Sequence, residues 1–353
     1  MPLVKTKSLL QACAEGKYAV GAFNVNGLDQ PGFLVKHAER LCSPIMVVEP
    51  GVMEKYVDFH DFAMVTARAA SAAKIPVCIH LSHGLDLEQF ERACKAGFTS
   101  VMYDGSKLPY EENVQNTKTA VEIGRRFGCA VEGELGALGS SFTNIAESMT
   151  DPAMARDFVA RTGIDILAVA VGNAHGFYKG TPSLDFKRLE DIKYAIMPFD
   201  CYLTLHGGTG IPEDHIKRSI EYGIVKICIY TEMCVEGKKD AKAYLEKYPD
   251  YEGNYDIPEL LAAIMGGYVR SMESCMQMFM SIGRGGSGLE PTQFAGTSKA
   301  STAGAFIAPQ STAGASIENT DVGPAYPSLP ALNPQAGAAG IFWDKAFSHG
   351  YTK

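Results

Sequence analysis

Histidines follow several short apolar segments of the chain, in positions that suit metal chemistry. The segment IHLSHG (79–84) contains His80 and His83, and His175 and His206 follow two later apolar segments. Neutral imidazole is a common ligand of zinc, and three protein ligands with one open position are typical of catalytic zinc sites. The sequence therefore predicts a metal centre on His83, His175 and His206, if the fold brings them together.

The elements that must position these residues form a repeating pattern. Short apolar segments rich in Val, Ile and Tyr have the length of strands, and the segments between them show helical periodicity. The predicted strands are 18–23, 44–49, 76–81, 100–104, 129–134, 165–172, 201–207 and 225–230. Eight strands alternating with helices indicate a parallel sheet covered by helices, and eight is the number that closes a (β/α)8 TIM barrel. The alternative, a doubly wound open sheet, lacks a G-x-G-x-x-G motif after the first strand.

Polar residues at the carboxyl ends of the strands are the candidate site, because TIM barrels build their active sites at that end. Ten residues meet this criterion: Asn24, Glu49, Ser82, His83, Asp104, Glu134, His175, His206, Cys228 and Tyr230. Three of them are histidines that would meet at one barrel mouth, which favours ligands over structural histidines. His80 is one step from Ser82 on the same strand face, and we interpret it as a hydrogen-bonded histidine in the wall of the site.

Two glycine-rich segments lie beside the predicted metal centre, NAHGFYKGTP at 173–182 and HGGTGIPED at 206–214. Glycines let backbone N–H groups approach an anion, and barrels commonly bind phosphate in the loop after the seventh strand. Lys179 could add a positive charge. Either segment by itself could also be a tight turn, but next to three histidines the pattern favours a phosphate site.

The composition excludes several classes of protein. The 353 residues carry a net charge of −8, so no basic surface for nucleic acid is expected. We find no uninterrupted apolar stretch that could cross a membrane and no signal peptide. Nine cysteines without a C-x-x-C motif suggest reduced thiols. We therefore expect a cytoplasmic protein.

Two domains are expected from the change in composition near Gly283. Residues 1–285 would form the barrel, and residues 286–353 would form an arm or tail rich in Ala, Gly, Ser and Pro. A Met-rich helix at 258–281 is predicted as core or as a subunit interface.

Seven motifs in fixed order make the segment from residue 1 to about 285 similar to the class II, zinc-dependent fructose-bisphosphate and tagatose-bisphosphate aldolases. They are YAVGAFNVNGLDQ, HLxHG, SVMYDGSKLPYEENVQNTK, VEGELGALG, VGNAHGFYKG, LTLHGGTGI and KICIYTEM. The resemblance implies Zn²⁺ or another divalent metal on His83, His175 and His206, with Glu134 either as an alternate ligand or as a residue that contacts the ligands. It implies substrate or phosphate contacts at Asn24, Asp104, Gly176, Lys179, Gly180, Gly207, Gly208, Thr209, Cys228 and Thr231. The implied reaction is aldol cleavage of a ketose phosphate through a zinc-bound enediolate.

The chain departs from the family pattern where that family moves protons. Ser82 replaces an aspartate, and the loop after the ELG motif has only Glu147 in place of adjacent acidic residues. Cys228 and Tyr230 replace an asparagine and an aspartate, and Glu49 replaces a small hydroxyl residue. A serine hydroxyl is a poor general base near pH 7. We hypothesise that Glu49 or Tyr230 transfers the proton instead, and the alternative for Glu49 is a pairing with a cation or a substrate hydroxyl.

Three functions fit these observations. The first is an aldol lyase for a ketose phosphate, and the second is a sugar phosphate epimerase that uses the same retro-aldol chemistry. The third is a non-catalytic paralogue that binds metal and sugar phosphate. The resemblance also implies a homo-oligomer, a dimer or tetramer.

Overall fold

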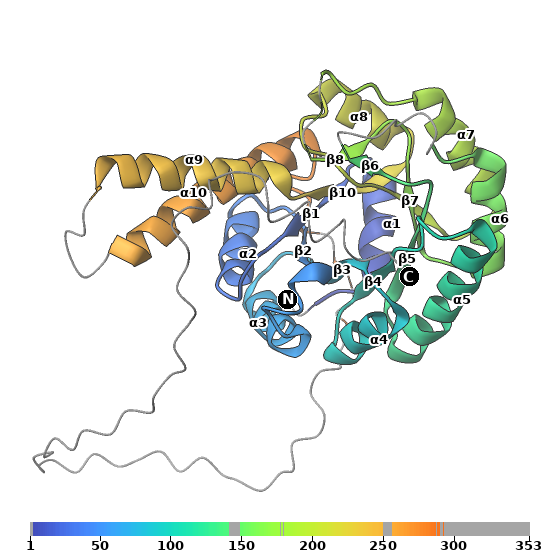
Figure 1. Cartoon of the computed structure of the whole chain (residues 1–353), viewed down its shortest axis with the longest axis horizontal. Coiled ribbons are helices and arrows are strands. Elements are labelled where there is room, and N and C mark those ends of the chain that lie inside the picture. The colour runs from blue at the N-terminus through green and yellow to red at the C-terminus, as the bar shows by residue number, and fades with distance from the viewer. Residues whose placement is uncertain are drawn as a thin grey trace, which may run out of the picture. The chain divides into compact units, whose positions relative to one another are not determined.

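The computed structural model describes residues 3–140, 149–176, 178, 180–249, 256–286, 288–289 and 292. Eight parallel strands form a closed barrel in the order β1-β10-β9-β7-β5-β4-β3-β2 (Figure 1). These strands are β1 (Val20–Asn24), β2 (Ile45–Pro50), β3 (Val77–Gly84), β4 (Ser100–Tyr103), β5 (Ala130–Leu135), β7 (Ile166–Val169), β9 (Tyr202–Leu205) and β10 (Ile224–Ile229). The predicted (β/α)8 barrel is confirmed.

Helices follow the strands along the chain and surround the barrel, whereas α1 precedes the first strand and α10 follows α9 (Figure 1). They are α1 (Thr6–Gly16), α2 (Gln30–Arg40), the 3-10 helix η1 (Gly51–Met53), α3 (Phe59–Ala72), α4 (Leu87–Ala96), α5 (Tyr110–Phe127), α6 (Pro152–Thr162), α7 (Phe186–Ile196), α8 (Glu213–Glu221), α9 (Thr231–Lys247) and α10 (Asp256–Met278). Several begin at an aspartate whose carboxylate accepts backbone N–H groups of the first turn, as Asp151 does for α6. Gly97 and Gly128 end α4 and α5 in the left-handed conformation that glycine adopts without strain.

The apolar side chains form two layers that follow the alternation of each strand. Met46 and Val48 of β2 pack inside the barrel, where Leu9 and Leu10 of α1 cover the amino ends of the strands. Val47, between them in sequence, packs in the layer between the sheet and the outer helices. Because α1 closes the amino end, the carboxyl end is the mouth of the barrel. There a short separate sheet pairs β6 (Gly139–Ser140) with β8 (Ala174–His175).

Helix α10 occupies the predicted Met-rich segment and packs along α9 (Figure 1). Met265, Met272 and Met276 are buried within the chain, so these methionines belong to the core. None of the described helices is long and apolar enough to cross a membrane. Glu147, Lys179 and almost all of the predicted arm 286–353 lie outside the described residues, and the domain boundary stays a prediction.

Candidate functional site

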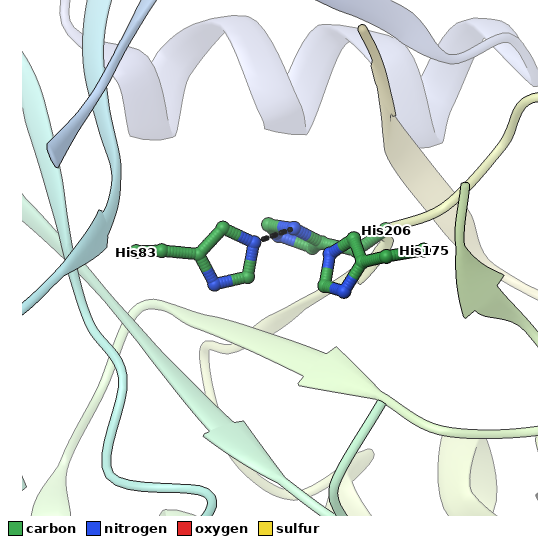
Figure 2. Close-up of side chains that lie close together, drawn as sticks. All are labelled: His83, His175 and His206. Carbon is green, nitrogen blue, oxygen red and sulfur yellow. Dashed lines mark hydrogen bonds between the residues drawn. The ribbon is translucent and has the colours of Figure 1, made fainter. Parts of the chain in front are cut away.

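His83, His175 and His206 converge at the barrel mouth, although they come from different parts of the chain (Figure 2). The centroid of the His83 ring lies 4.9 Å from that of the His175 ring and 4.8 Å from that of the His206 ring. One ring nitrogen from each residue falls within 4.8 Å of the other two. The prediction that the fold brings these residues together therefore agrees with the geometry.

A local irregularity turns His83 toward the mouth. In a regular strand Ser82 and His83 would point to opposite faces, and Ser82 has the inward parity of Cys78 and His80. The pairing of β3 with β4 shifts register between Leu81 and Gly84, and His83 has φ 53°. Because this left-handed conformation is rare for residues with a side chain, the bulge is a specific feature of the site.

Asp104 orients the His83 ring from the end of β4. Its Oδ2 lies 2.8 Å from His83 Nδ1, and its Oδ1 accepts hydrogen bonds from the backbone N–H and the hydroxyl of Ser106 at 3.1 and 2.7 Å. Burial opposes the charge on Asp104, but His83 and Ser106 outweigh it and hold the pKa of this carboxyl below its usual value. A carboxylate accepts only, so Nδ1 of His83 carries the proton and Nε2 presents a lone pair.

Glu132 orients the His206 ring in the same way, from inside the barrel. Its Oε1 lies 2.6 Å from His206 Nε2, and its Oε2 lies 2.6 Å from Nζ of Lys226. The pKa of Glu132 is lowered because Lys226, His80 and His206 outweigh the effect of complete burial. Nε2 of His206 is therefore the protonated nitrogen, and Nδ1 presents the lone pair.

These two assignments leave a gap in the hydrogen bonding that suits a cation. His206 Nδ1 and His83 Nε2 face each other at 3.2 Å, and with both rings neutral they are both acceptors, so the contact needs a proton or another cation between them (Figure 2). Burial opposes a second proton on His206, but Cys228 and Glu132 outweigh burial and raise the pKa of His206 to about 10, so in the absence of a metal ion a proton occupies this contact. Glu134 adds a buried Oε2 that has no hydrogen-bond partner among the described residues. It also forms a second group with His83 and Asp104, whose ligand atoms lie within 4.8 Å of one another. Imidazole lone pairs beside an unsatisfied carboxylate fit a divalent metal ion.

Three further predicted residues lie at the inner wall of the mouth. Ser82, Asn24 and Cys228 are buried at the ends of β3, β1 and β10. Cys228 Sγ lies 3.6 Å from His206 Nε2. Burial raises the pKa of this thiol, but His206 and Lys226 outweigh burial and lower it. No carboxylate occupies position 82, so the three histidines meet at the mouth without the aspartate that the family pattern has beside His83.

Glu49 faces away from the histidines. It has the parity of Val47, which packs in the layer between sheet and helices, and it is 1% exposed. Burial, with smaller contributions from Glu54 and Asp58, raises the pKa of Glu49 to about 9. Neither of its carboxylate oxygens has a hydrogen-bond partner among the described residues. This placement does not support the hypothesis that Glu49 transfers a proton to substrate.

Tyr230 lies between the ends of β10 and β1. Its hydroxyl donates to Asn26 Oδ1 at 2.7 Å, and Asn26 Nδ2 donates to the hydroxyl of Tyr268 in α10 at 2.6 Å. Burial and the neighbouring Cys234 raise the pKa of Tyr230, which keeps the phenol protonated. Tyr230 therefore acts as a hydrogen-bond donor to Asn26, and its catalytic role stays a prediction.

The two glycine-rich segments lie side by side, as an anion site would require. The hydroxyl of Tyr178 accepts from the backbone N–H of Ala174 at 2.8 Å and donates to the carbonyl oxygen of Gly207 at 3.0 Å. Gly207 has φ 65°, and a Cβ there would collide with the carbonyl oxygen of Ala174. Sequence reasoning did not identify Tyr178, although its position between the predicted Gly176 and Lys179 was a signal.

The amino end of α9 adds backbone donors to the same region. The helix begins at Thr231, and Thr209 Oγ1 accepts the N–H of Glu232 at 3.3 Å. Gly180 and Gly208 lie on the two glycine-rich segments. A helix amino end beside glycine-rich backbone is suited to bind phosphate.

Comparisons with known proteins give matches that cover most of this chain. The family model described as fructose-bisphosphate aldolase class-II matches residues 4–284. A probable fructose-bisphosphate aldolase of Bacillus subtilis (strain 168) is 41% identical over 260 residues, which is 71% of this chain and 89% of that protein. The crystal structure of the YdjI aldolase from Escherichia coli K12 has a TM-score of 0.68 at 31% identity, over 80% of this chain and 99% of that one. A putative fructose-1,6-bisphosphate aldolase from Coccidioides immitis has a TM-score of 0.70 at 27% identity, over 80% and 98%.

Proposed function

The chain belongs to the class II fructose-bisphosphate aldolase family, and from this premise we propose that it is a zinc-dependent aldol lyase for a phosphorylated ketose. The observation that carries the proposal is the pair of facing acceptor nitrogens, His83 Nε2 and His206 Nδ1, with His175 beside them. Asp104 and Glu132 support it, because each orients one imidazole with its lone pair toward the other ligands.

His83, His175, His206 and Glu134 would hold the metal ion. When bound, a divalent cation stabilises negative charge that develops on the ketose oxygens as a carbon–carbon bond breaks. The glycine-rich segments and the amino end of α9 would hold the substrate phosphate through backbone N–H groups. This anchor would orient the sugar toward the mouth of the barrel.

The proton transfer needs a group other than Ser82. Of the two candidates from the sequence we retain Tyr230, because Glu49 has the parity that faces the helix layer. We propose that Tyr230, held by Asn26, donates a proton to the substrate or to a product oxygen. A homo-oligomer remains a prediction from the family resemblance, and a cytoplasmic location remains a prediction from the sequence composition.

Incubation of zinc-loaded protein with a panel of ketose mono- and bisphosphates tests the function. Release of triose phosphate, coupled to oxidation of NADH, is the expected result. His175→Ala should abolish the release, whereas His60→Ala, an exposed histidine on α3, should leave it unchanged. Tyr230→Phe should lower the turnover rate by about 100-fold with the same phosphate dependence.

The products separate the three candidate functions. Epimers without trioses would replace the lyase by an epimerase. Tight binding of zinc and sugar phosphate without turnover of any ketose phosphate would replace it by a binding protein.

A further inference from the structure

A continuous chain of hydrogen bonds runs through the barrel interior to the candidate metal centre. Ser100 Oγ lies 2.8 Å from His80 Nδ1, and His80 Nε2 lies 3.0 Å from Lys226 Nζ. Lys226 Nζ donates to Glu132 Oε2 at 2.6 Å, and Glu132 Oε1 contacts His206 Nε2 at 2.6 Å. Ser100, His80, Glu132 and Lys226 are fully buried, and His206 is almost completely buried. Four strands, β3, β4, β5 and β10, supply the members that lead to His206 in β9's carboxyl loop.

The donors and acceptors of these side chains fix the direction in which each hydrogen bond of the series is donated. A lysine ammonium can only donate and a carboxylate can only accept. His80 must therefore accept from Lys226 at Nε2 and donate from Nδ1 to Ser100. On the other side of Lys226, Glu132 must accept from Nε2 of His206. The proton on His206 is thus placed on the nitrogen that points into the barrel, away from His83.

We propose that Lys226 and Glu132 are positioning residues for the metal centre, which select the His206 tautomer whose Nδ1 is free to bind the metal. The inference rests on the proposed metal-dependent function. Neither residue touches substrate or the facing nitrogens, so both act through His206. Lys226 supports this role, because its buried ammonium pairs with Glu132 at 2.6 Å and so favours the carboxylate, whose two oxygens can only accept.

A purely structural role for the buried pair makes a different prediction. If Lys226 and Glu132 only neutralise each other, then any variant that folds should bind metal like the wild type. A positioning role predicts that the effect of Glu132→Gln on metal affinity depends on whether Lys226 is present. The reason is that the amide of glutamine has one donor end and one acceptor end, and Lys226 decides which end faces His206.

Glu132→Gln should reverse the tautomer. Lys226 still requires an acceptor, so the amide oxygen faces Lys226 and the NH2 group faces His206 Nε2. His206 must then accept at Nε2 and carry its proton on Nδ1, the nitrogen that faces His83. We expect zinc affinity to fall by about 10- to 100-fold.

The double variant Glu132→Gln with Lys226→Met should recover most of that affinity. Without the ammonium, the amide can turn so that its oxygen accepts from His206 Nε2. Its NH2 group can then donate to His80 Nε2, which lies 3.7 Å from Glu132 Oε2. Recovery through a second substitution in the barrel interior is not expected for a role in packing alone.

Two measurements on the full-length protein test the inference. Zinc affinity is measured by competition with a chromogenic chelator for the wild type, Glu132→Gln and the double variant. Ser100→Ala is the matched control, since it alters the far end of the chain without reversing its direction, and its affinity should equal that of the wild type. Protein labelled with 15N-histidine and loaded with cadmium-113 should show metal coupling at Nδ1 of His206 and at Nε2 of His83.

The outcomes are distinct. Coupling at Nε2 of His206 overturns the inference, and it does so even if Glu132→Gln fails to fold. Equal zinc affinity in all folded variants, or a double variant that binds zinc more weakly than Glu132→Gln, also overturns it. Wild-type protein that binds neither zinc nor cadmium overturns the metal-dependent function and this inference with it, whereas the other outcomes leave the proposed function standing.

Discussion

Replacement of Glu49 by glutamine should stabilise the protein, and the gain should grow with pH. Glu49 is buried between the sheet and the helices, and its carboxylate oxygens have no partner among the described residues. Glutamine has the shape of the protonated carboxyl but cannot ionise. The variant therefore removes the cost of keeping Glu49 protonated and changes little else.

The magnitude follows from the difference in pKa between the folded and unfolded chain. The pKa of Glu49 is raised to about 9 from an ordinary value of 4.5. Between these values the folded chain binds one more proton than the unfolded chain, so the wild-type free energy of unfolding falls as pH rises. At pH 7 the cost is about 3 kcal/mol, whereas at pH 5 it is about 1 kcal/mol. The variant should lack this slope and gain those amounts relative to the wild type.

Urea denaturation followed by far-UV circular dichroism, at pH 5 and pH 8 and at one protein concentration, measures the effect. Glu122→Gln, at an exposed position within α5, is the matched control and should show no pH-dependent gain. A Glu49→Gln variant whose advantage is the same at both pH values would refute the reasoning. Turnover should stay within about twofold of the wild type, since a loss near 100-fold would restore Glu49 as a proton carrier.

Three other predictions concern the site itself. Tyr178→Phe removes the hydroxyl that bonds to both Ala174 and Gly207. We expect the free energy of unfolding, measured by urea denaturation, to fall by about 1–3 kcal/mol and the KM for phosphorylated substrate to rise. Unchanged values of both quantities would contradict this role. Ser82→Asp supplies a carboxylate at the mouth and should raise fructose-bisphosphate cleavage by about 100-fold in a triose phosphate assay, a proposal that fails if the rate does not rise. Zinc at 100 times its Kd should raise the free energy of unfolding by about 3 kcal/mol, and an equal rise in His175→Ala would show that zinc binds elsewhere.

The eight-stranded pattern and the placing of histidines after strands were readable from sequence because both depend on local periodicity. An apolar segment of strand length predicts a strand wherever it packs, and parallel strands bring their carboxyl ends to one edge. His83, His175 and His206 could therefore be grouped although they are far apart in the chain. Glu132 and Lys226 were also detectable, since each lies two residues before an identified position, Glu134 or Cys228, on the same strand face.

The direction in which a side chain at a strand end points depends on the assembled backbone, which sequence patterns do not contain. Glu49 follows the regular alternation of side chains along β2, but only the assembled barrel shows that its side of the strand faces the helix layer. His83 reaches the mouth against the same alternation, because a bulge and a left-handed backbone turn it inward.

The sequence by itself determined the barrel, its family and the three histidines, because strand periodicity and motif order are properties of neighbouring residues. The tertiary structure alone decided which nitrogen of His83 and which nitrogen of His206 is free. For His83 the choice depends on Asp104 at the end of β4, and for His206 it depends on a carboxylate from β5 and an ammonium from β10 that meet inside the barrel, 94 positions apart in the chain. Hydrogen-bond direction is a property of contacts in space, so it appears only when the strands are assembled.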